Sequence, residues 1–298
     1  MTLPRRHFAE MRAPEFRTDT SAWIAVLPVA AIEQHGPHLP VSTDTTIAEG
    51  QIARTIELLP DHLPVTFLPV QAVGKSDEHI DSPGTLTLSW EIVTKAWIEI
   101  GDSLARAGIR KLVIVTSHGG NVPIMDIVAR EMRIRHRMLA VATSWLRFGQ
   151  PDGLYTDRER AFGIHGGDIE TSILLHLRPD LVDMAVAEDF RSAQEDLVRQ
   201  ARHLRAHGPA QFGWKAQDLN PAAPSATPPR PPPRRAGSRS TTPHAVLSNF
   251  STISTASPWS SSTPPIKFSR HRIRQSHRIK GITAAQAGRR ILRQRTRP

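Results

Sequence analysis

The sequence contains no cysteine among its 298 residues. Disulfide bonds, thiolate metal ligands and cysteine nucleophiles are therefore excluded. No apolar run reaches the roughly 18 residues that a membrane-spanning helix needs, and residues 1–17 lack the apolar core of a secretory signal. The G-x-S-x-G, Walker A and G-x-G-x-x-G patterns are also missing. We therefore expect a cytoplasmic protein that uses none of these mechanisms.

Acidic residues are missing from the last quarter of the chain. Residues 221–298 contain 15 Lys and Arg and 12 of the 25 prolines but no Asp or Glu, whereas residues 1–220 contain 23 basic and 28 acidic residues. We therefore divide the chain into a domain of residues 1–220 and a basic Pro/Arg/Ser-rich tail of residues 221–298. We expect this tail to be largely disordered, because it can bury little apolar surface.

Four short runs in the first domain are almost continuously apolar, as expected of strands that are buried on both faces. These runs are Trp23–Ile32, Val65–Val70, Lys111–Thr116 and Met138–Thr143. Helical patterns lie between or after them, at Thr45–Leu58, Ser89–Ala107, Val122–Arg135 and from about Gly167 onward. Strands that alternate with helices predict an α/β fold with a mostly parallel sheet covered on both faces.

Polar clusters follow three of the predicted strands. Glu33-Gln34-His35-Gly36 comes after the first, Asp77-Glu78-His79 lies in the loop after the second, and Ser117-His118-Gly119-Gly120-Asn121 comes after the third. In parallel sheets, ligands bind beyond the carboxyl ends of the strands. The three clusters therefore predict one shared site, although any one of them alone would be typical of an ordinary polar loop.

The residue types in these clusters indicate a metal site. Glu33 and His35 are two residues apart, so that in an extended segment both side chains lie on one side. Gly36 turns the chain and can bring Asp44 back toward them, while His118 stands at the end of a buried strand. Carboxylates and imidazoles together suit zinc, manganese or iron. Alternatively, Asp44 caps the following helix and His118 is a core or capping residue.

A further cluster, Gly163 to Ser172, contains His165 in a glycine-rich loop where a helix begins. His165 is a candidate general acid or base, because the unperturbed pKa of histidine lies near neutrality. Glu170 lies in the first turn of that helix, can face the same cavity and is a second candidate catalytic residue. The alternative for Glu170 is favourable placement near the positive end of the helix.

Four motifs occur in order: E-Q-H-G-P-H-L-P-x-x-T-D, D-E-H-x-x-S-P-G-T-L, S-H-G-G-N and H-G-G-D-x-E-T-S. Together they resemble the creatininase family over roughly residues 21–221. The resemblance implies a three-layer α/β sandwich with a mostly parallel central sheet. It also implies two divalent metal ions, zinc first and manganese or iron as alternatives, and a homo-oligomer, often a hexamer.

The resemblance also assigns individual residues. It implies one ion bound by Glu33, Asp44 and His118 and a second bound by His35 and Asp44. His165 matches the catalytic histidine of the family. For this chain these assignments are expectations, and they require that the fold places the side chains close together.

The chain departs from true creatininase at positions around the site. That enzyme carries a glutamate ligand where this chain has Gly120, so the second ion is expected to recruit Glu170 or to be held more weakly. An aromatic residue of that enzyme is replaced by Gly119. We expect the substrate pocket to be lined by Glu78, His79, Gly119, Gly120 and Trp145. Glu78 and His79 either orient the metal ligands or are ordinary polar residues of a surface loop.

The sequence therefore predicts an enzyme, a metal-dependent amidohydrolase that uses a metal-activated water on a small cyclic or linear amide, at a non-peptide C–N bond. The alternatives within the family are a formamide hydrolase and a hydrolase of peptide maturation. A third alternative is an inactive scaffold whose basic tail binds nucleic acid.

The tail departs from the family from about residue 221. One hypothesis is a change of reading frame near Pro221, which would explain the abrupt loss of acidic residues. Translating the other two frames of the gene from codon 221 tests it: a glycine-containing loop and a closing helix are expected in one of them.

Overall fold

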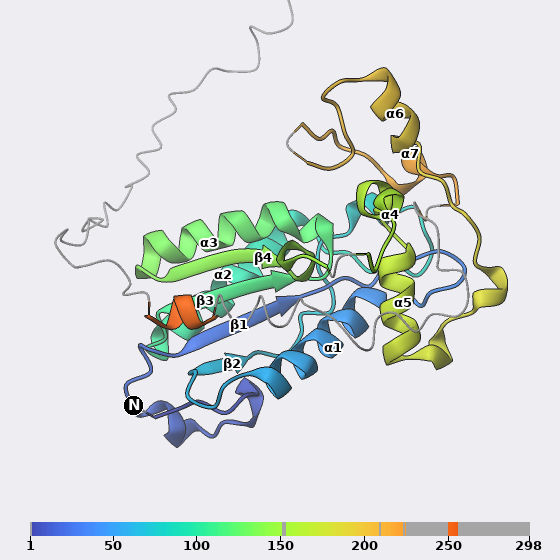
Figure 1. The fold of residues 1–298 in the computed structure, drawn as a ribbon. Coiled ribbons are helices and arrows are strands. Elements are labelled where there is room, and N and C mark those ends of the chain that lie inside the picture. The colour runs from blue at the N-terminus through green and yellow to red at the C-terminus, as the bar shows by residue number, and fades with distance from the viewer. Residues whose placement is uncertain (1, 151–152, 209, 223, 225–249, 256–298) are drawn as a thin grey trace, which may run out of the picture. The chain divides into compact units, whose positions relative to one another are not determined.

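The structure, a computed structural model, describes residues 2–150, 153–208, 210–222, 224 and 250–255. All of them belong to one compact unit, Met1–Pro258. At its centre lies a parallel sheet with the strand order β2-β1-β3-β4 (Figure 1). The strands are β1 (Ile24–Val29), β2 (Val65–Phe67), β3 (Lys111–Thr116) and β4 (Leu139–Ser144). The four predicted strands and the parallel sheet are thereby confirmed.

The register of the sheet places two of the polar clusters next to each other. β1 and β3 pair along their whole length, from Ile24 with Lys111 to Val29 with Thr116. Because the strands are parallel, the segments that follow Val29 and Thr116 leave the same edge of the sheet. Figure 1 shows that the arrowheads of β1, β3 and β4 point toward α4 (Asp157–Phe162) and α5 (Asp168–Leu177).

Three long helices follow the strands as predicted: α1 (Thr43–Leu58), α2 (Trp90–Arg106) and α3 (Val122–His136). The helix predicted from about Gly167 is α5. Two further short helices are α6 (Gln194–Gln200) and α7 (Ala216–Leu219). Among the described residues, no helix combines the length and the apolar character that crossing a membrane would require.

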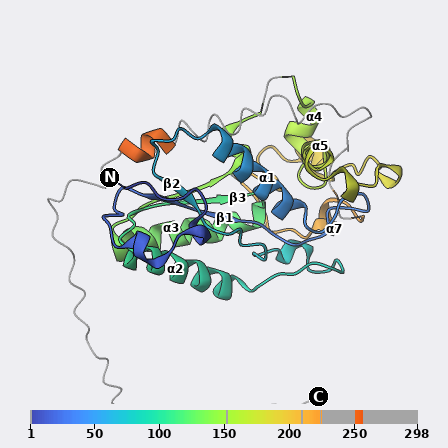
Figure 2. The same ribbon diagram turned by 90° about the horizontal axis from the view of Figure 1, so that it is seen from below.

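The helices cover the sheet in layers (Figure 2). α2 and α3 pack on one face, in a buried cluster that includes Trp97, Met125, Val128 and Met132. α1 lies on the other face, where Ile52 joins a second cluster with the opposite side chains of the strands. Burial on both faces explains why the sequences of β1, β2 and β3 are continuously apolar rather than alternating, whereas the edge strand β4 is only half-buried, contrary to the prediction. The three-layer α/β architecture agrees with the predicted fold class.

A short helical turn at residues 250–255 completes the second cluster. Phe250 is 2% exposed and packs edge-on against Phe67 of β2, with ring centroids 6.2 Å apart. The Lys111 ammonium group donates to the carbonyl oxygen of Ser254 at 2.7 Å. This part of the tail therefore contributes to the core. Apart from residues 221, 222, 224 and 250–255, the tail lies outside the described part of the chain. The prediction that it is largely disordered therefore stays a prediction.

Candidate metal centre

The four side chains expected to bind metal converge at the carboxyl end of the sheet. Glu33 and His35 lie in the segment after β1, Asp44 in the first turn of α1, and His118 directly after β3. All four are buried, with exposed fractions between 0% and 6%. His118 Nδ1 lies 3.2 Å from Glu33 Oε1 and 3.5 Å from Asp44 Oδ2. His35 Nε2 lies 3.8 Å from Asp44 Oδ2.

Several acceptor atoms in this group have no hydrogen-bond partner within the described chain. They are both carboxylate oxygens of Glu33, Asp44 Oδ2 and His35 Nε2. A buried polar atom without a partner is costly, and a buried charge is more so. Glu33, His35 and Asp44 also offer ligand atoms that lie within 4.8 Å of one another. The arrangement therefore fits a cation at the centre of the cluster.

The outer nitrogens of two histidines are held by backbone carbonyl groups. His35 Nδ1 lies 3.1 Å from the carbonyl oxygen of Glu33, and His118 Nε2 lies 3.0 Å from that of Lys75. A carbonyl oxygen only accepts, so each of these nitrogens carries the proton. His35 Nε2 and His118 Nδ1 therefore face the carboxylates and, when unprotonated, offer the lone pairs that metal-binding imidazoles require.

His165 and Glu170 reach the same cluster from the loop before α5 and from its first turn. His165 Nδ1 lies 3.6 Å from Glu33 Oε1, and its Nε2 contacts the backbone carbonyl of Gln34. Glu170 Oε2 lies 3.9 Å from His35 Nε2 and accepts a hydrogen bond from the Gly166 amide at 2.6 Å. Gly166 has a φ of +68°, a conformation that favours glycine. The turn at this glycine thus places both side chains beside the expected ligands.

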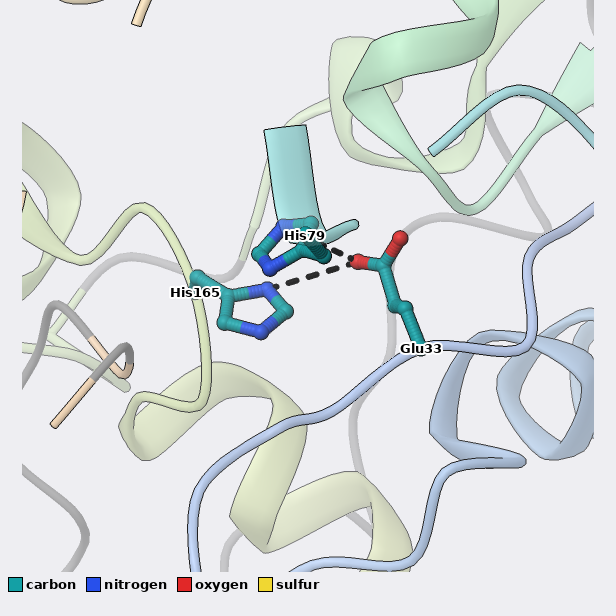
Figure 3. A group of neighbouring side chains, drawn as sticks. All are labelled: Glu33, His79 and His165. Carbon is teal, nitrogen blue, oxygen red and sulfur yellow. Dashed lines mark ion pairs between the residues drawn. The ribbon is translucent and has the colours of Figure 1, made fainter. Parts of the chain in front are cut away.

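The loop after β2 closes another side of the cluster. His79 is buried, and its Nε2 lies 3.4 Å from Glu33 Oε1. Figure 3 shows the rings of His79 and His165 lying beside each other, both contacting the Glu33 carboxylate. Glu78 Oε1 lies 3.2 Å from His118 Nε2, on the side of that ring away from Glu33. Glu78 therefore contacts a proposed ligand and lies outside the group of unpaired acceptors.

The remaining predicted pocket residues differ in position. A Cβ atom on Gly120 would lie 2.1 Å from Glu78 Oε1, so the Glu78 carboxylate occupies the space that a side chain there would need. A Cβ atom on Gly119 would meet nothing within 4 Å. Trp145 is 2% exposed and lines an apolar cavity of about 210 Å³ together with Val115 and Phe250. Its contribution to a substrate pocket stays a prediction.

Burial and neighbouring charges shift the pKa values of these groups in opposite directions. Burial alone would raise the pKa of Glu33, but His118, His79 and His165 hold it well below its usual range. Burial and the Glu33 charge raise the pKa of Asp44 well above its usual range. Burial and the nearby His35 lower the pKa of His165 to about 4. His165 is therefore a neutral imidazole near pH 7 and can accept a proton.

Two groups that contact the site histidines could not be recognised, or only barely, from the sequence. The first is the backbone carbonyl group of Lys75, which a residue of any type could supply. Gln34 Nε2 lies 3.0 Å from His79 Nδ1 and 3.2 Å from His165 Nε2. Its only signal is a polar side chain between two predicted ligands, Glu33 and His35.

Comparison with known proteins identifies relatives of this chain. The family model described as creatinine amidohydrolase (creatininase) matches residues 9–247. A mycofactocin precursor peptide peptidase from Mycobacterium tuberculosis (strain ATCC 25618 / H37Rv) is 36% identical over 161 residues, which are 52% of this chain and 58% of the relative. A creatinine amidohydrolase from Pseudomonas putida is 31% identical over 185 residues, which are 57% and 70% of the two chains.

The chain thus spans a little over half of the length of the mycobacterial relatives that it matches. Among solved structures, a creatinine amidohydrolase (creatininase) aligns with a TM-score of 0.60 at 23% identity, covering 85% of this chain and 99% of that chain. At this identity the alignment shows the shared fold. Because the family model extends over most of its residues, the chain belongs to the creatininase family.

Proposed function

We propose that the chain is a metal-dependent hydrolase that cleaves a C–N amide bond. The observation that carries the proposal is the buried group of unpaired acceptors formed by Glu33, His35 and Asp44. Divalent cations would compensate these charges and lone pairs. Solved creatininase structures that share the fold include a manganese form and a zinc–zinc form. These names support a divalent metal in this chain without selecting the ion.

We assign one ion to Glu33, Asp44 and His118 and a second to His35, Asp44 and Glu170. Creatininase has a glutamate ligand at the position of Gly120. In this chain Glu170 would replace it, since Glu170 Oε2 lies 3.9 Å from His35 Nε2. That oxygen already accepts from the Gly166 amide, but a carboxylate oxygen has a second lone pair. Carboxylate and imidazole donors accept zinc, manganese and iron alike.

The bound ions supply Lewis acidity and lower the pKa of water toward neutrality. Among the residues of this chain, we assign the proton transfer to His165. Its Nδ1 faces the cluster while its Nε2 is held by the Gln34 carbonyl, so the ring orientation is fixed. With a pKa of about 4 it is neutral near pH 7. It can thus take a proton at Nδ1 and deliver it to the leaving nitrogen.

Short linear peptides are the substrate class that we place first, in place of the non-peptide amide expected from the sequence, with creatinine second. The chain is 36% identical to a relative named as a peptide peptidase and 31% identical to one named as a creatinine amidohydrolase. Gly119 and Gly120 also leave this side of the site without the side chains that true creatininase has there. A flat ring would have fewer contacts at this position, whereas an extended peptide does not need an aromatic clamp.

The test is a metal and substrate panel on the purified full chain. Chelated protein is reloaded with zinc, manganese or iron and assayed against short peptides, formamides and creatinine. We expect hydrolysis that depends on the metal and falls more than about 10²-fold in Asp44→Asn, because even residues behind metal ligands cost 10–100-fold. Asp126→Asn, exposed on α3, is the matched control. Absence of metal binding in the wild-type chain would overturn the proposal.

Three further expectations stay proposals for this chain: a homo-oligomer, a cytoplasmic location, and nucleic-acid binding by the basic tail in an otherwise inactive scaffold. Light scattering coupled to gel filtration measures the first, and fractionation of cells the second. For the third, DNA affinity that falls steeply with salt, in a chain without metal-dependent hydrolysis, would favour the scaffold over the enzyme.

A further inference from the structure

We propose that Gln34 is a positioning residue that fixes the proton of His79 on Nε2, so that this ring turns its N–H toward Glu33 instead of binding metal. The inference rests on the proposed function for the role of Glu33 as a metal ligand. It concerns a group of three residues, Glu33, His79 and His165, whose atoms lie close enough together to hold an ion. The hydrogen bonds around that group decide which nitrogen of each ring carries a proton.

The orientation of the Gln34 amide follows from the backbone. The Gly36 amide donates to Gln34 Oε1 at 2.9 Å. A backbone N–H can only donate, so the atom facing it must be the side-chain oxygen, and the amide nitrogen must point the other way. That nitrogen lies 3.0 Å from His79 Nδ1. Since an amide nitrogen carries only donors, His79 Nδ1 is the acceptor.

The position of the His79 proton follows in turn. An imidazole ring, neutral or protonated, always keeps at least one N–H proton, and a nitrogen that accepts a hydrogen bond carries no proton. With Nδ1 accepting from Gln34, that proton is on Nε2. This nitrogen lies 3.4 Å from Glu33 Oε1 (Figure 3). His79 therefore turns its N–H toward the carboxylate and presents no lone pair to a cation.

The other three rings have the opposite arrangement. The outer nitrogens of His35, His118 and His165 contact backbone carbonyl oxygens, which only accept. For His165, the Gln34 carbonyl is a nearer partner of Nε2 than the Gln34 amide nitrogen at 3.2 Å, so Nε2 donates to the carbonyl. The inner nitrogens of these three rings face the carboxylates and can serve as metal ligands when unprotonated. His79 differs because its outer nitrogen meets an amide N–H.

The consequence is a division of roles around Glu33. The His79 N–H faces Oε1 from one side and favours one direction of the carboxylate, while the other carboxylate lone pairs face the proposed ion. With an N–H of His79 facing Glu33, the group of Glu33, His79 and His165 is not a third metal site. Gln34 contacts no metal in this arrangement and acts through His79.

Histidine ¹⁵N NMR of the zinc-loaded full chain tests the proton positions directly. The His79 resonances are assigned by their loss in His79→Gln. We expect a protonated Nε2 and an unprotonated Nδ1 for His79, before and after zinc is added. A zinc-coordinated or unprotonated Nε2 on His79 would overturn the inference. Because the tautomer is also visible in metal-free protein, it can be read even if the chain binds no zinc or hydrolyses none of the substrates tested.

Gln34→Glu gives the matched perturbation. The new carboxylate can still accept from the Gly36 amide but cannot donate to His79. We expect the His79 proton to move to Nδ1 and zinc affinity to fall by about 10–100-fold, as for other residues behind metal ligands. Gln200→Glu, exposed at the end of α6, should change neither quantity. An unchanged His79 tautomer in Gln34→Glu would contradict the inference.

His79→Gln serves as a second variant should Gln34→Glu fail to fold. It keeps an N–H donor but has no imidazole lone pair, so we expect the zinc content per chain to equal that of the wild type. Loss of one zinc ion per chain would identify His79 as a ligand and overturn the inference. Normal zinc content and tautomers without any hydrolysis would instead count against the proposed function alone.

Discussion

Glu159 is a buried carboxyl group that stabilises the loop carrying His165. It is 5% exposed, and its Oε1 accepts a hydrogen bond from the Ile169 amide in the first turn of α5 at 3.1 Å. It therefore satisfies a helix-terminal donor that no neighbouring side chain of α5 caps. Burial, with the nearby charges of Asp168 and Glu170, raises the pKa of Glu159 from 4.5 to about 7. Glu159 is therefore partly protonated and partly ionised near pH 7.

This shift predicts a specific dependence of stability on pH. The folded state binds the Glu159 proton more tightly than the unfolded chain, so folding is opposed once the group ionises. The cost is absent below pH 4.5, grows as pH rises, and is complete above about pH 7. Glu159→Gln keeps an acceptor for Ile169 without the charge. We expect its unfolding free energy to exceed that of the wild type at pH 8 by up to about 3 kcal/mol.

Denaturant titrations at pH 4.5 and pH 8 measure the difference. The two proteins should be nearly equal in stability at pH 4.5, where the wild-type carboxyl group is largely protonated. Glu188→Gln, an exposed carboxylate, should follow the wild type at both pH values. A Glu159→Gln variant that is less stable than the wild type at pH 8 would show that the ionised carboxylate is the better partner for the helix.

At the scale of elements, the strands were the most predictable part of the fold. Lys111–Thr116 is buried along its whole length, and its apolar sequence predicted that strand to the residue. Glu33 and His118 were predictable as neighbours because each directly follows one of two parallel strands. The proton positions were not, since they depend on the Lys75 carbonyl and the Gln34 amide. These partners come from other loops or carry no distinctive side chain.

The turn at residues 250–255 was not predictable either, because the surrounding sequence has the composition of a disordered tail. Phe250 nevertheless lies in the second core cluster with Phe67, Val113 and Trp145. We therefore predict that Phe250→Ala lowers the unfolding free energy by about 3 kcal/mol, the usual cost of removing a buried phenylalanine ring. Leu204→Ala, at a side chain that is 45% exposed, should change it by less than about 0.5 kcal/mol.

Denaturant unfolding of the full chain measures both variants. Equal stability of Phe250→Ala and wild type would mean that this segment does not hold the sheet face in solution. The result also bears on the basic tail, because a tail that supplies a core residue cannot be removed at residue 220 without exposing apolar surface.

At the scale of the whole molecule, the charge of the chain is divided between its two parts. Residues 1–220 have an excess of acidic side chains, whereas all 15 charges of residues 221–298 are positive. The acidic groups that matter for the site are a small buried subset of the first part, in which Glu33 and Asp44 lie within reach of the same imidazole nitrogen. The stability of the domain should therefore depend on a cation more than its net charge suggests.

Metal removal tests this dependence. The folded site concentrates acceptors that the unfolded chain exposes to water, so a cation that binds only the folded state stabilises it. At a free zinc concentration of 100 times Kd the gain is about 2.7 kcal/mol, which corresponds to roughly 5–10 °C in Tm for a domain of this size. We expect a chelator to lower the Tm by that amount and added zinc to restore it.

Thermal melts of Glu33→Gln and Asp126→Asn separate binding at the site from binding elsewhere. Glu33→Gln removes a charge from the cluster, so its apo protein should melt above the apo wild type while its response to zinc shrinks. Asp126→Asn should keep the full response. If chelator and zinc left the wild-type Tm unchanged, the buried acceptors would have to be neutralised by protons alone, as the raised pKa values of Asp44 and His118 already allow without metal.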